Sequence, residues 1–364
     1  MSSLLVIALA CGIVGQTGTI AYIAGESQES YRLTLIDAAT GETTPVGQGD
    51  RDAYPRWSPD GTHIAYQSKQ PEGTGIRVAC PDSGEDKALA HQFSWNYEPR
   101  WSPDGRKLAY SSDGDMAPLQ AILVYDLDTD TETIWGGTHR GLIRPVWLPT
   151  TDLMKALDPD DQAAAEALGL MELSAEAEER GVLLAVGVGG APPNMAADIY
   201  IVTPTLAVPL LPFLMPDSYR YVEWCVEPDN DGRQIAYESN DGGDRELFVL
   251  GRRGITNVSN HPAADWNPVW APDNNWIAFE SFRQGRRGIY RVLISTANVF
   301  PVAVDAYYDC WAPDWSPDGE HLVFVSDRTG APQLFIADKE GKTQQQLTKD
   351  AFPALAPTWR PDTN

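Results

Sequence analysis

The chain has 364 residues, 43% of them hydrophobic, with 27 basic and 51 acidic side chains and a formal net charge of −24 at pH 7. Such a chain repels nucleic-acid backbones and anionic membrane surfaces, so we expect neither as a partner. Its length and apolar content suffice for one large domain. Beyond the N-terminus, no segment is long and apolar enough to span a membrane.

The N-terminal segment, residues 1–17, has an apolar run from Leu4 to Ala10 that is followed by Cys11. An apolar run before a cysteine is typical of a bacterial lipoprotein signal, although no Lys or Arg precedes this one. We predict an exported protein, periplasmic or extracellular, with Cys11 as the lipidation candidate and this anchor as its sole membrane contact. The alternative is an unstructured tail or an apolar strand on a cytoplasmic protein.

A thirteen-residue phrase recurs along the rest of the chain. It reads YPRWSPDGTHIAY at 54–66, EPRWSPDGRKLAY at 98–110, NPVWAPDNNWIAF at 267–279 and APDWSPDGEHLVF at 312–324. A period of about 45 residues indicates a repeat architecture. The anchor of each copy is a tryptophan, except in the fourth copy, where we expect Val226. The seven anchors are Trp57, Trp101, Trp147, Val226, Trp270, Trp315 and Trp359.

Each copy contains the same structural parts. A proline two residues before the anchor favours an extended entry and cannot donate a ladder hydrogen bond. The Ser-Pro-Asp-Gly sequence after the anchor is a tight turn, and a β-rich run such as HIAYQS follows it. A polar loop and two more short strands complete the copy. Four short strands every ~45 residues predict one blade of a β-propeller.

The two ends of the chain complete one blade between them. Residues 18–47 supply its second, third and fourth strands, and APTWRPD at 356–362 supplies its first. We therefore predict an all-β fold over residues 18–364, a seven-bladed β-propeller closed by the N- and C-terminal strands, with six blades as the alternative count. Closure removes the free sheet edges that invite aggregation.

The interval after Trp147 is longer than the others by about 35 residues. Asp158 can cap a helix there with Pro159 at its first position, and an alanine-rich stretch follows. We predict a short helical insertion at about 151–181. Because it enters at a turn between first and second strands, it should lie on the face opposite the loops that precede the anchors. It either covers its own blade or docks a partner.

The loops that precede the anchors should meet at one mouth of the central channel, and they are rich in aromatic and acidic residues. Such loops suit a sugar, a peptide segment or a cationic group. Alternatively, their aromatic rings simply pack as wedges between adjacent blades. The candidate ligand- or partner-binding residues are Asp52, Tyr54, Tyr97, Tyr219, Asp265, Trp266, Asp309 and Trp311.

Three histidines, His91, His139 and His261, also precede their anchors and should lie on this face. With nearby aspartates they could bind a divalent metal, but their blades are not all neighbours. We therefore expect no cofactor and assign no catalytic residue, with the metal site as the weaker alternative. Cys80, Cys225 and Cys310 form no CxxC pair, and we expect free thiols.

The repeats resemble the TolB-like family of β-propellers. The segments NHPAADWNPVWAPDNNWIAFES at 260–281 and DWSPDGEHLVFVSDRTGAPQLFIAD at 314–338 match its pattern, and the resemblance extends over nearly all of residues 18–362. Arg283 and Arg328 match the family repeat, and we expect each to pair with a carboxylate of a neighbouring blade. The family includes periplasmic envelope proteins, propellers of prolyl-oligopeptidase-type peptidases and polysaccharide lyases. The resemblance is therefore specific for fold and weak for function.

The resemblance implies a non-catalytic binding or scaffolding propeller, which we expect to be a monomer. Its partner would be a protein or a cell-envelope component, carbohydrate included, held at the channel mouth. The sequence contains no Gly-x-Ser-x-Gly elbow, Walker loop or HExxH motif, so an enzyme is the less expected reading. One alternative is a carbohydrate-active lyase or hydrolase with a His/Asp site at the mouth. Another is a propeller that gates a separate peptidase.

Overall fold

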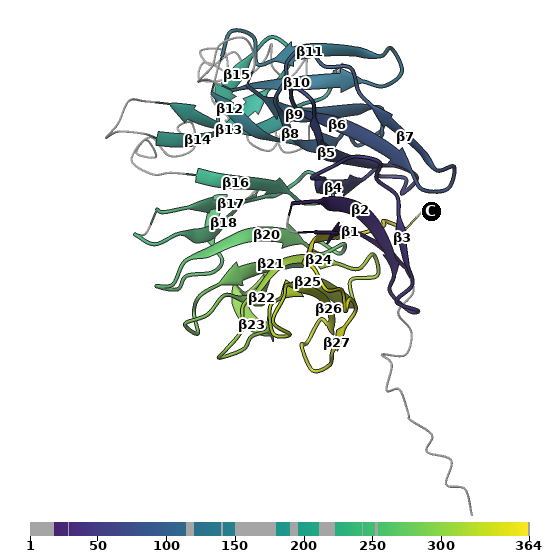
Figure 1. The fold of residues 1–364 in the computed structure, drawn as a ribbon. Coiled ribbons are helices and arrows are strands. Elements are labelled where there is room, and N and C mark those ends of the chain that lie inside the picture. Colours follow the sequence, from purple (N-terminus) through teal and green to yellow (C-terminus); the bar gives the residue numbers. More distant parts are fainter. Residues whose placement is uncertain are drawn as a thin grey trace, which may run out of the picture.

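The computed structural model describes residues 18–27, 29–113, 120–139, 141–149, 180–189, 196–210, 223–241, 243–251 and 254–362. These residues form seven four-stranded antiparallel sheets, the blades of a propeller (Figure 1). Seven blades were predicted from the repeats, and that count is confirmed. The predicted helical insertion falls almost wholly outside the described residues, as do residues 1–17 with Cys11. No helix in the described ranges is long and apolar enough to cross a membrane.

The blades are numbered from the one that holds both chain ends, and their strands are given from the channel outward. Blade 1 comprises β28 (Ala354–Trp359), β1 (Thr19–Gly25), β2 (Tyr31–Asp37) and β3 (Thr43–Pro45). Blade 2 comprises β4 (Ala53–Trp57), β5 (Ile64–Gln70), β6 (Gly73–Cys80) and β7 (Glu85–Ala88). Blade 3 comprises β8 (Asn96–Trp101), β9 (Lys107–Ser112), β10 (Ala121–Asp126) and β11 (Thr131–Trp135). Blade 4 comprises β12 (Leu142–Trp147), β13 (Leu183–Gly189), β14 (Ala196–Val202) and β15 (Ala207–Pro209).

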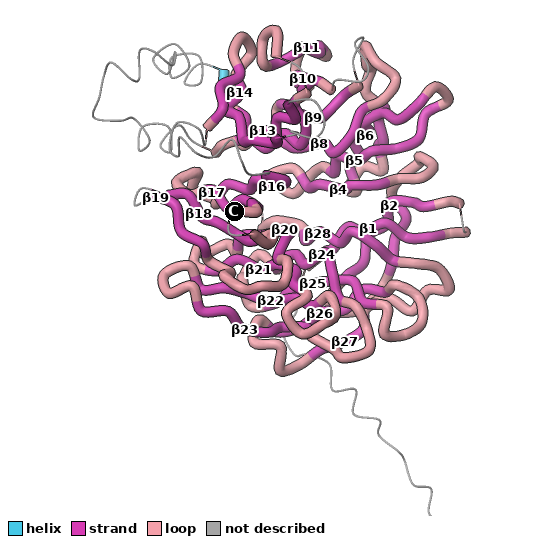
Figure 2. The backbone as a smooth tube through the Cα atoms, turned by 90° about the vertical axis from the view of Figure 1, so that its left-hand side faces the viewer, coloured by secondary structure: helices cyan, strands magenta, loops and turns pink. Residues whose placement is uncertain are grey.

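The remaining blades have the same order. Blade 5 comprises β16 (Glu223–Pro228), β17 (Ile235–Ser239), β18 (Glu246–Gly251) and β19 (Gly254–Asn257). Blade 6 comprises β20 (Asp265–Trp270), β21 (Trp276–Ser281), β22 (Gly288–Leu293) and β23 (Asn298–Ala303). Blade 7 comprises β24 (Cys310–Trp315), β25 (His321–Ser326), β26 (Gln333–Asp338) and β27 (Gln344–Gln346). Figure 2 shows these strands in magenta and the turns between them in pink.

The ring closes as predicted. In blade 1 the C-terminal strand β28 pairs antiparallel with β1, so that Trp359 lies opposite Ile20 and Ala354 opposite Ala24. In Figure 1 the purple N-terminal strands lie beside the yellow C-terminal ones. The core lies between blades, where apolar side chains of adjacent sheets interdigitate. Ile20 and Trp359 pack there against Val323 of blade 7.

The anchor tryptophans join each blade to the one before it. The indole Nε1–H of Trp101 donates to the backbone carbonyl of Arg56 at 2.9 Å, and that of Trp270 donates to the carbonyl of Glu227 at 2.9 Å. In both cases the acceptor is the residue directly before the preceding blade's anchor position. Trp57, Trp147 and Trp315 make the same bond. The repeated tryptophan is thus explained, since each of these five buries apolar surface and satisfies a carbonyl, whereas the Nε1 of Trp359 has no hydrogen-bond partner among the described residues.

The anchor position of blade 5 is held by Pro228, and the expectation of Val226 is wrong by two residues. Pro228 pairs with Ile235 as Trp270 pairs with Ile277, and the carbonyl accepting the Trp270 bond belongs to Glu227. A proline has no indole, so the bond is missing between blades 4 and 5. The sequence misled because Trp224 and Val226 imitate the usual spacing.

A bulge interrupts every inner strand three residues before the anchor. There the ladder register shifts, and in six blades, all except blade 5, the backbone turns left-handed at φ of 49° to 57°. The Asn267 N–H donates to the Glu238 carboxylate at 2.6 Å, and the Ala312 N–H donates to Glu280 at 2.8 Å. Recurrence in six blades makes the bulge a feature of the fold. The residues at this position are Tyr54, Glu98, Arg144, Asn267, Ala312 and Ala356.

Candidate functional site

One face of the ring carries most of the exposed aromatic side chains. Because the strands are antiparallel, the loops that enter the inner strands and the loops from second to third strands lie on the same face, which we call the channel mouth. Of eight exposed large hydrophobic residues in the described chain, two lie on outer strands, Ile134 and Phe300. The six at the channel mouth are Tyr54, Trp95, Phe282, Tyr307, Tyr308 and Phe352.

A pocket of about 170 Å³ opens at the mouth between blades 2, 3 and 4. The Tyr97 hydroxyl donates to Asp113 at 3.4 Å, and Arg144 Nε lies 3.6 Å from Glu98 Oε2. Two predicted binding residues, Tyr54 and Tyr97, are therefore brought together here. The lining mixes aromatic, amide and charged groups, which suits a polar side chain of a ligand. It consists of Tyr54, Tyr97, Glu98, Ser111, Gln120, Ile143 and Arg144.

On blades 5 to 7 the mouth is organised by a fully buried carboxylate, Glu280. It accepts from Trp266 Nε1 at 2.9 Å, from Asn267 Nδ2 at 2.8 Å and from the Ala312 backbone N–H at 2.8 Å. Its fourth donor is Nε of Arg287. With four donors on two oxygens, Glu280 fixes the orientation of the surrounding side chains.

Two arginines and two tryptophans alternate above this carboxylate. The guanidinium carbons of Arg245 and Arg287 each lie 5.8 Å from the Trp266 ring centre, and that of Arg287 lies 5.6 Å from the Trp311 ring centre. Arg245 is held from below by the buried Glu238, as Arg287 is by Glu280. We call Arg245, Trp266, Arg287 and Trp311 the Arg–Trp ladder.

The predicted aspartates are used mainly inside the protein. Asp52 is 3% exposed and accepts the Leu33 N–H of blade 1 at 2.9 Å. Burial raises the pKa of Asp52 to about 6. Asp265 is fully buried, whereas Asp309 remains partly exposed 3.3 Å from Arg286. The first two therefore hold loops together, which differs from the expectation that they face a ligand. Tyr219 lies outside the described residues.

The family arginines pair within their own blades, so the expectation of neighbouring-blade partners is wrong. Arg283 Nη2 lies 2.8 Å from Asp265 Oδ2, both in blade 6. In blade 7 the equivalent Arg328 meets the thiol of Cys310 at 3.3 Å, and burial raises the pKa of that thiol. The inner-strand start and the second-strand end are adjacent in one sheet, which places these pairs together. Cys80, Cys225 and Cys310 are free, as expected.

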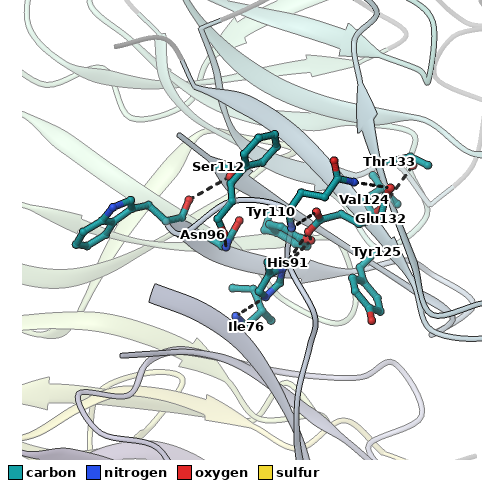
Figure 3. Close-up of polar contacts among 12 residues, drawn as sticks. Ile76, His91, Asn96, Tyr110, Ser112, Val124, Tyr125, Glu132 and Thr133 are labelled. Carbon is teal, nitrogen blue, oxygen red and sulfur yellow. Dashed lines mark hydrogen bonds and ion pairs between the residues drawn. The ribbon is translucent and has the colours of Figure 1, made fainter. Parts of the chain in front are cut away.

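The three histidines are engaged in separate contacts. His91 Nε2 accepts the Ile76 N–H at 2.9 Å, and its Nδ1 lies 2.9 Å from the Glu132 carboxylate, which also receives the Tyr110 hydroxyl (Figure 3). His261 Nδ1 accepts the Ala263 N–H at 3.0 Å. The His139 ring lies 4.7 Å from the Tyr200 ring. Within the described residues, no three His, Cys, Asp or Glu side chains are grouped so that they could hold a metal ion.

Sequence reasoning missed the polar half of the site. Glu98 and Arg144 lie at the bulge position of their strands. The loop pattern singled out the neighbouring aromatic residues and overlooked these two charged ones. Glu238 and Glu280 were readable in principle, because AYES and AFES place a carboxylate where the next repeat has Val325. A charged residue in an otherwise apolar strand is a signal for a buried partner.

Comparisons with known proteins show resemblance in both sequence and fold. No family model matches the chain. A Tol-Pal system protein TolB from Francisella tularensis subsp. mediasiatica is 31% identical over 139 residues, which is 36% of this chain and 32% of the relative. A TolB homolog from Chlorobium chlorochromatii is 27% identical over 135 residues, 36% of this chain and 30% of the relative. The chain thus spans about a third of the length of the curated relatives it matches.

Solved structures match over a larger share of the chain, at identities that show the fold alone. The β-propeller domain of the Trilobed protease from Pyrococcus furiosus has a TM-score of 0.64 and 14% identity, covering 93% of this chain and 97% of that one. TolB from Acinetobacter baumannii has a TM-score of 0.59 and 16% identity, covering 95% and 67%. A prolyl endopeptidase has a TM-score of 0.61 and 12% identity, covering 91% and 48%. The chain is a TolB-like β-propeller, similar in structure to the propeller domains of peptidases.

Proposed function

We propose that this chain is a non-catalytic binding propeller that engages a protein partner through its channel mouth. The observation that carries the proposal is that six of the eight exposed large hydrophobic residues in the described ranges lie on that face. Contiguous exposed aromatic surface marks interaction sites in soluble proteins. Tyrosine, tryptophan and arginine, the residue types at this mouth, are also those enriched at binding hot spots.

The mouth offers two rigid anchoring points on opposite parts of the ring. The first is the pocket of about 170 Å³ beside Tyr54 and Tyr97. The second is the Arg–Trp ladder, which the buried Glu238 and Glu280 hold in place. Groups that are ordered before binding lose less conformational entropy in a complex. A partner that reaches both would cover the channel entrance, which favours a protein over a small molecule.

Binding is favoured over catalysis because three acid–base groups of the mouth are engaged internally. Asp265 is paired with Arg283, and His91 and His261 each accept a backbone N–H through a ring nitrogen. A general base needs a free position facing the substrate. The resemblance to TolB, a Tol-Pal system protein, supports a protein partner and an exported location in the cell envelope.

Site-specific photocrosslinking tests the proposal. A photoreactive phenylalanine analogue is placed at Tyr54, at Tyr307 or, as a control, at the exposed Lys342 in the β26–β27 turn on the opposite face. We expect the two mouth positions to trap the same protein in extracts of the source cell and the control position to miss it. That protein is then purified, and we expect Tyr54→Ala to weaken its affinity at least tenfold. Equal trapping at Lys342, or unchanged affinity, would place the interaction elsewhere.

A further inference from the structure

We propose that the Arg–Trp ladder is a carboxylate-binding site, which receives an aspartate or glutamate side chain or the chain terminus of the partner. The inference rests on the proposed function for the origin of the carboxylate, although the chemistry of the site can be tested without a partner. The ladder is formed by Arg245, Trp266, Arg287 and Trp311.

The hydrogen bonds of Glu280 leave one end of Arg287 available. Arg287 donates to Glu280 through Nε. The remaining acceptor sites of Glu280 are filled by donors from Trp266, Asn267 and Ala312. Within the described residues, Nη1 and Nη2 of Arg287 form no hydrogen bond, and the side chain is 31% exposed. The buried carboxylate therefore uses neither of these two NH₂ groups. They form a fork that matches the two oxygens of a second carboxylate.

The tryptophans make the site specific for a planar anion. The indole rings of Trp266 and Trp311 both lie within 6 Å of the Arg287 guanidinium, so its cation already occupies their faces. A cationic ligand would have to displace that arginine together with its bond to Glu280. An anion needs no such displacement. It would approach the exposed edge of a guanidinium that the rings hold in one plane.

The local charge favours an anion even though the chain carries −24 overall. Charges separated by more than about 8 Å are largely screened at physiological ionic strength. Close to the ladder, the acidic groups Glu238, Glu280 and Asp265 are buried and lie beneath arginines, while Arg245 and Arg287 are each 31% exposed. An approaching ligand therefore meets the cations first. The adjacent Arg286, 47% exposed, is paired with the partly exposed Asp309 at 3.3 Å, so this pair adds no net charge.

Tryptophan indole NMR signals report on the site directly. The probe is a blocked pentapeptide with one central glutamate, and its matched controls carry glutamine or lysine instead. We expect the glutamate peptide to shift the Nε1–H signals of Trp266 and Trp311, and the glutamine peptide to leave them in place. We expect Arg287→Gln to weaken glutamate-peptide binding at least tenfold. Arg106→Gln, a charge-matched change at a 69% exposed residue elsewhere, should leave it unchanged.

The outcomes separate the two proposals. Equal shifts with the glutamate and glutamine peptides, or none with either, overturn the carboxylate site; a partner trapped at Tyr54 and Tyr307 would still support the binding function. Conversely, selective glutamate binding without any trapped partner supports a small-anion site and overturns the protein-binding role. If Arg287→Gln fails to fold, which the spectrum reveals, the three peptides on the unmodified protein decide alone.

Discussion

The guanidinium of Arg100 and the carboxylate of Glu227 meet at 2.7 Å across the central channel, although 127 residues separate them. They come from the inner strands of blades 3 and 5, so the pair passes blade 4, which lies between them in the ring. The pair therefore joins blades 3 and 5, and the indole bond is missing between blades 4 and 5. Arg56 lies close enough to Arg100 that this second cation lowers the pKa of Arg56 to about 10.

Breaking this pair should destabilise the ring. Glu227→Gln leaves Arg100, whose side chain is 27% exposed, without its anion, and we expect a loss of about 1–3 kcal/mol in the free energy of unfolding. Arg100→Met should cost a similar amount, and the double variant less than the sum. Urea unfolding of the four proteins measures the coupling energy. A coupling within error of zero would mean that water in the channel screens the pair.

Asp52 should make the protein less stable as the pH rises. Burial raises its folded pKa to about 6, above the usual 3.8, so its protonated form is favoured in the folded state. The stability that protonation provides is complete below pH 4 and is lost as the pH passes through about 6. Asp52→Asn keeps an acceptor for the Leu33 N–H but does not titrate. Relative to the unmodified protein, it should gain up to about 3 kcal/mol between pH 4 and pH 7.

Urea unfolding at several pH values checks this difference, with Asp60→Asn in an exposed turn as the control. The quantity to follow with pH is the difference in the free energy of unfolding between each variant and the unmodified protein, because other groups titrate in both proteins. Asp314, whose pKa burial also raises to about 6, should show the same sign in Asp314→Asn. A difference between Asp52→Asn and the unmodified protein that stays constant with pH would contradict the assigned cause.

The equivalent arginines of blades 6 and 7 offer a matched comparison. Arg283→Met leaves the fully buried Asp265 without a counter-ion, and we expect a loss of about 3–5 kcal/mol. Arg328→Met removes bonds to neutral groups only, the Cys310 thiol, the Ser326 hydroxyl and the Gln344 amide, and we expect about 1 kcal/mol. Both arginines also lie over aromatic rings, which methionine can still cover. Thermal and urea unfolding give the two values, and equal losses would show that ring contact outweighs the ion pair.

The sequence was sufficient for the architecture because the repeat is carried by local chemistry. The Ser102 hydroxyl donates to Asp104 at 2.6 Å in the Ser-Pro-Asp-Gly turn, and Ser58 makes the same bond to Asp60. These bonds lie within four residues, so the pattern can be read directly. The closure of the ring at Trp359 and Ile20 could also be predicted from the sequence, because the N-terminal repeat lacks a first strand and the C-terminal segment supplies one.

The site was less accessible to sequence because it depends on contacts between blades. The pocket joins Tyr54 to Arg144, and the ladder joins Arg245 to Trp311; each pair is set by ring geometry rather than by spacing. The loop composition correctly singled out aromatic residues on this face. It did not indicate that Asp52 would be buried, because a short loop gives no sign of which side chain turns inward.

The indole bonds between blades can be tested with two buried tryptophans that differ in one respect. Trp270 is 8% exposed and donates to the Glu227 carbonyl at 2.9 Å, whereas Trp359 is 5% exposed and its buried Nε1 has no hydrogen-bond partner. Phenylalanine removes a similar apolar volume at either position but a hydrogen bond only at the first. We therefore expect Trp270→Phe to cost about 1 kcal/mol more than Trp359→Phe in urea unfolding. If Trp359→Phe is the more damaging, then packing at the closing strand, rather than the indole bond, dominates the contribution of the repeated tryptophan.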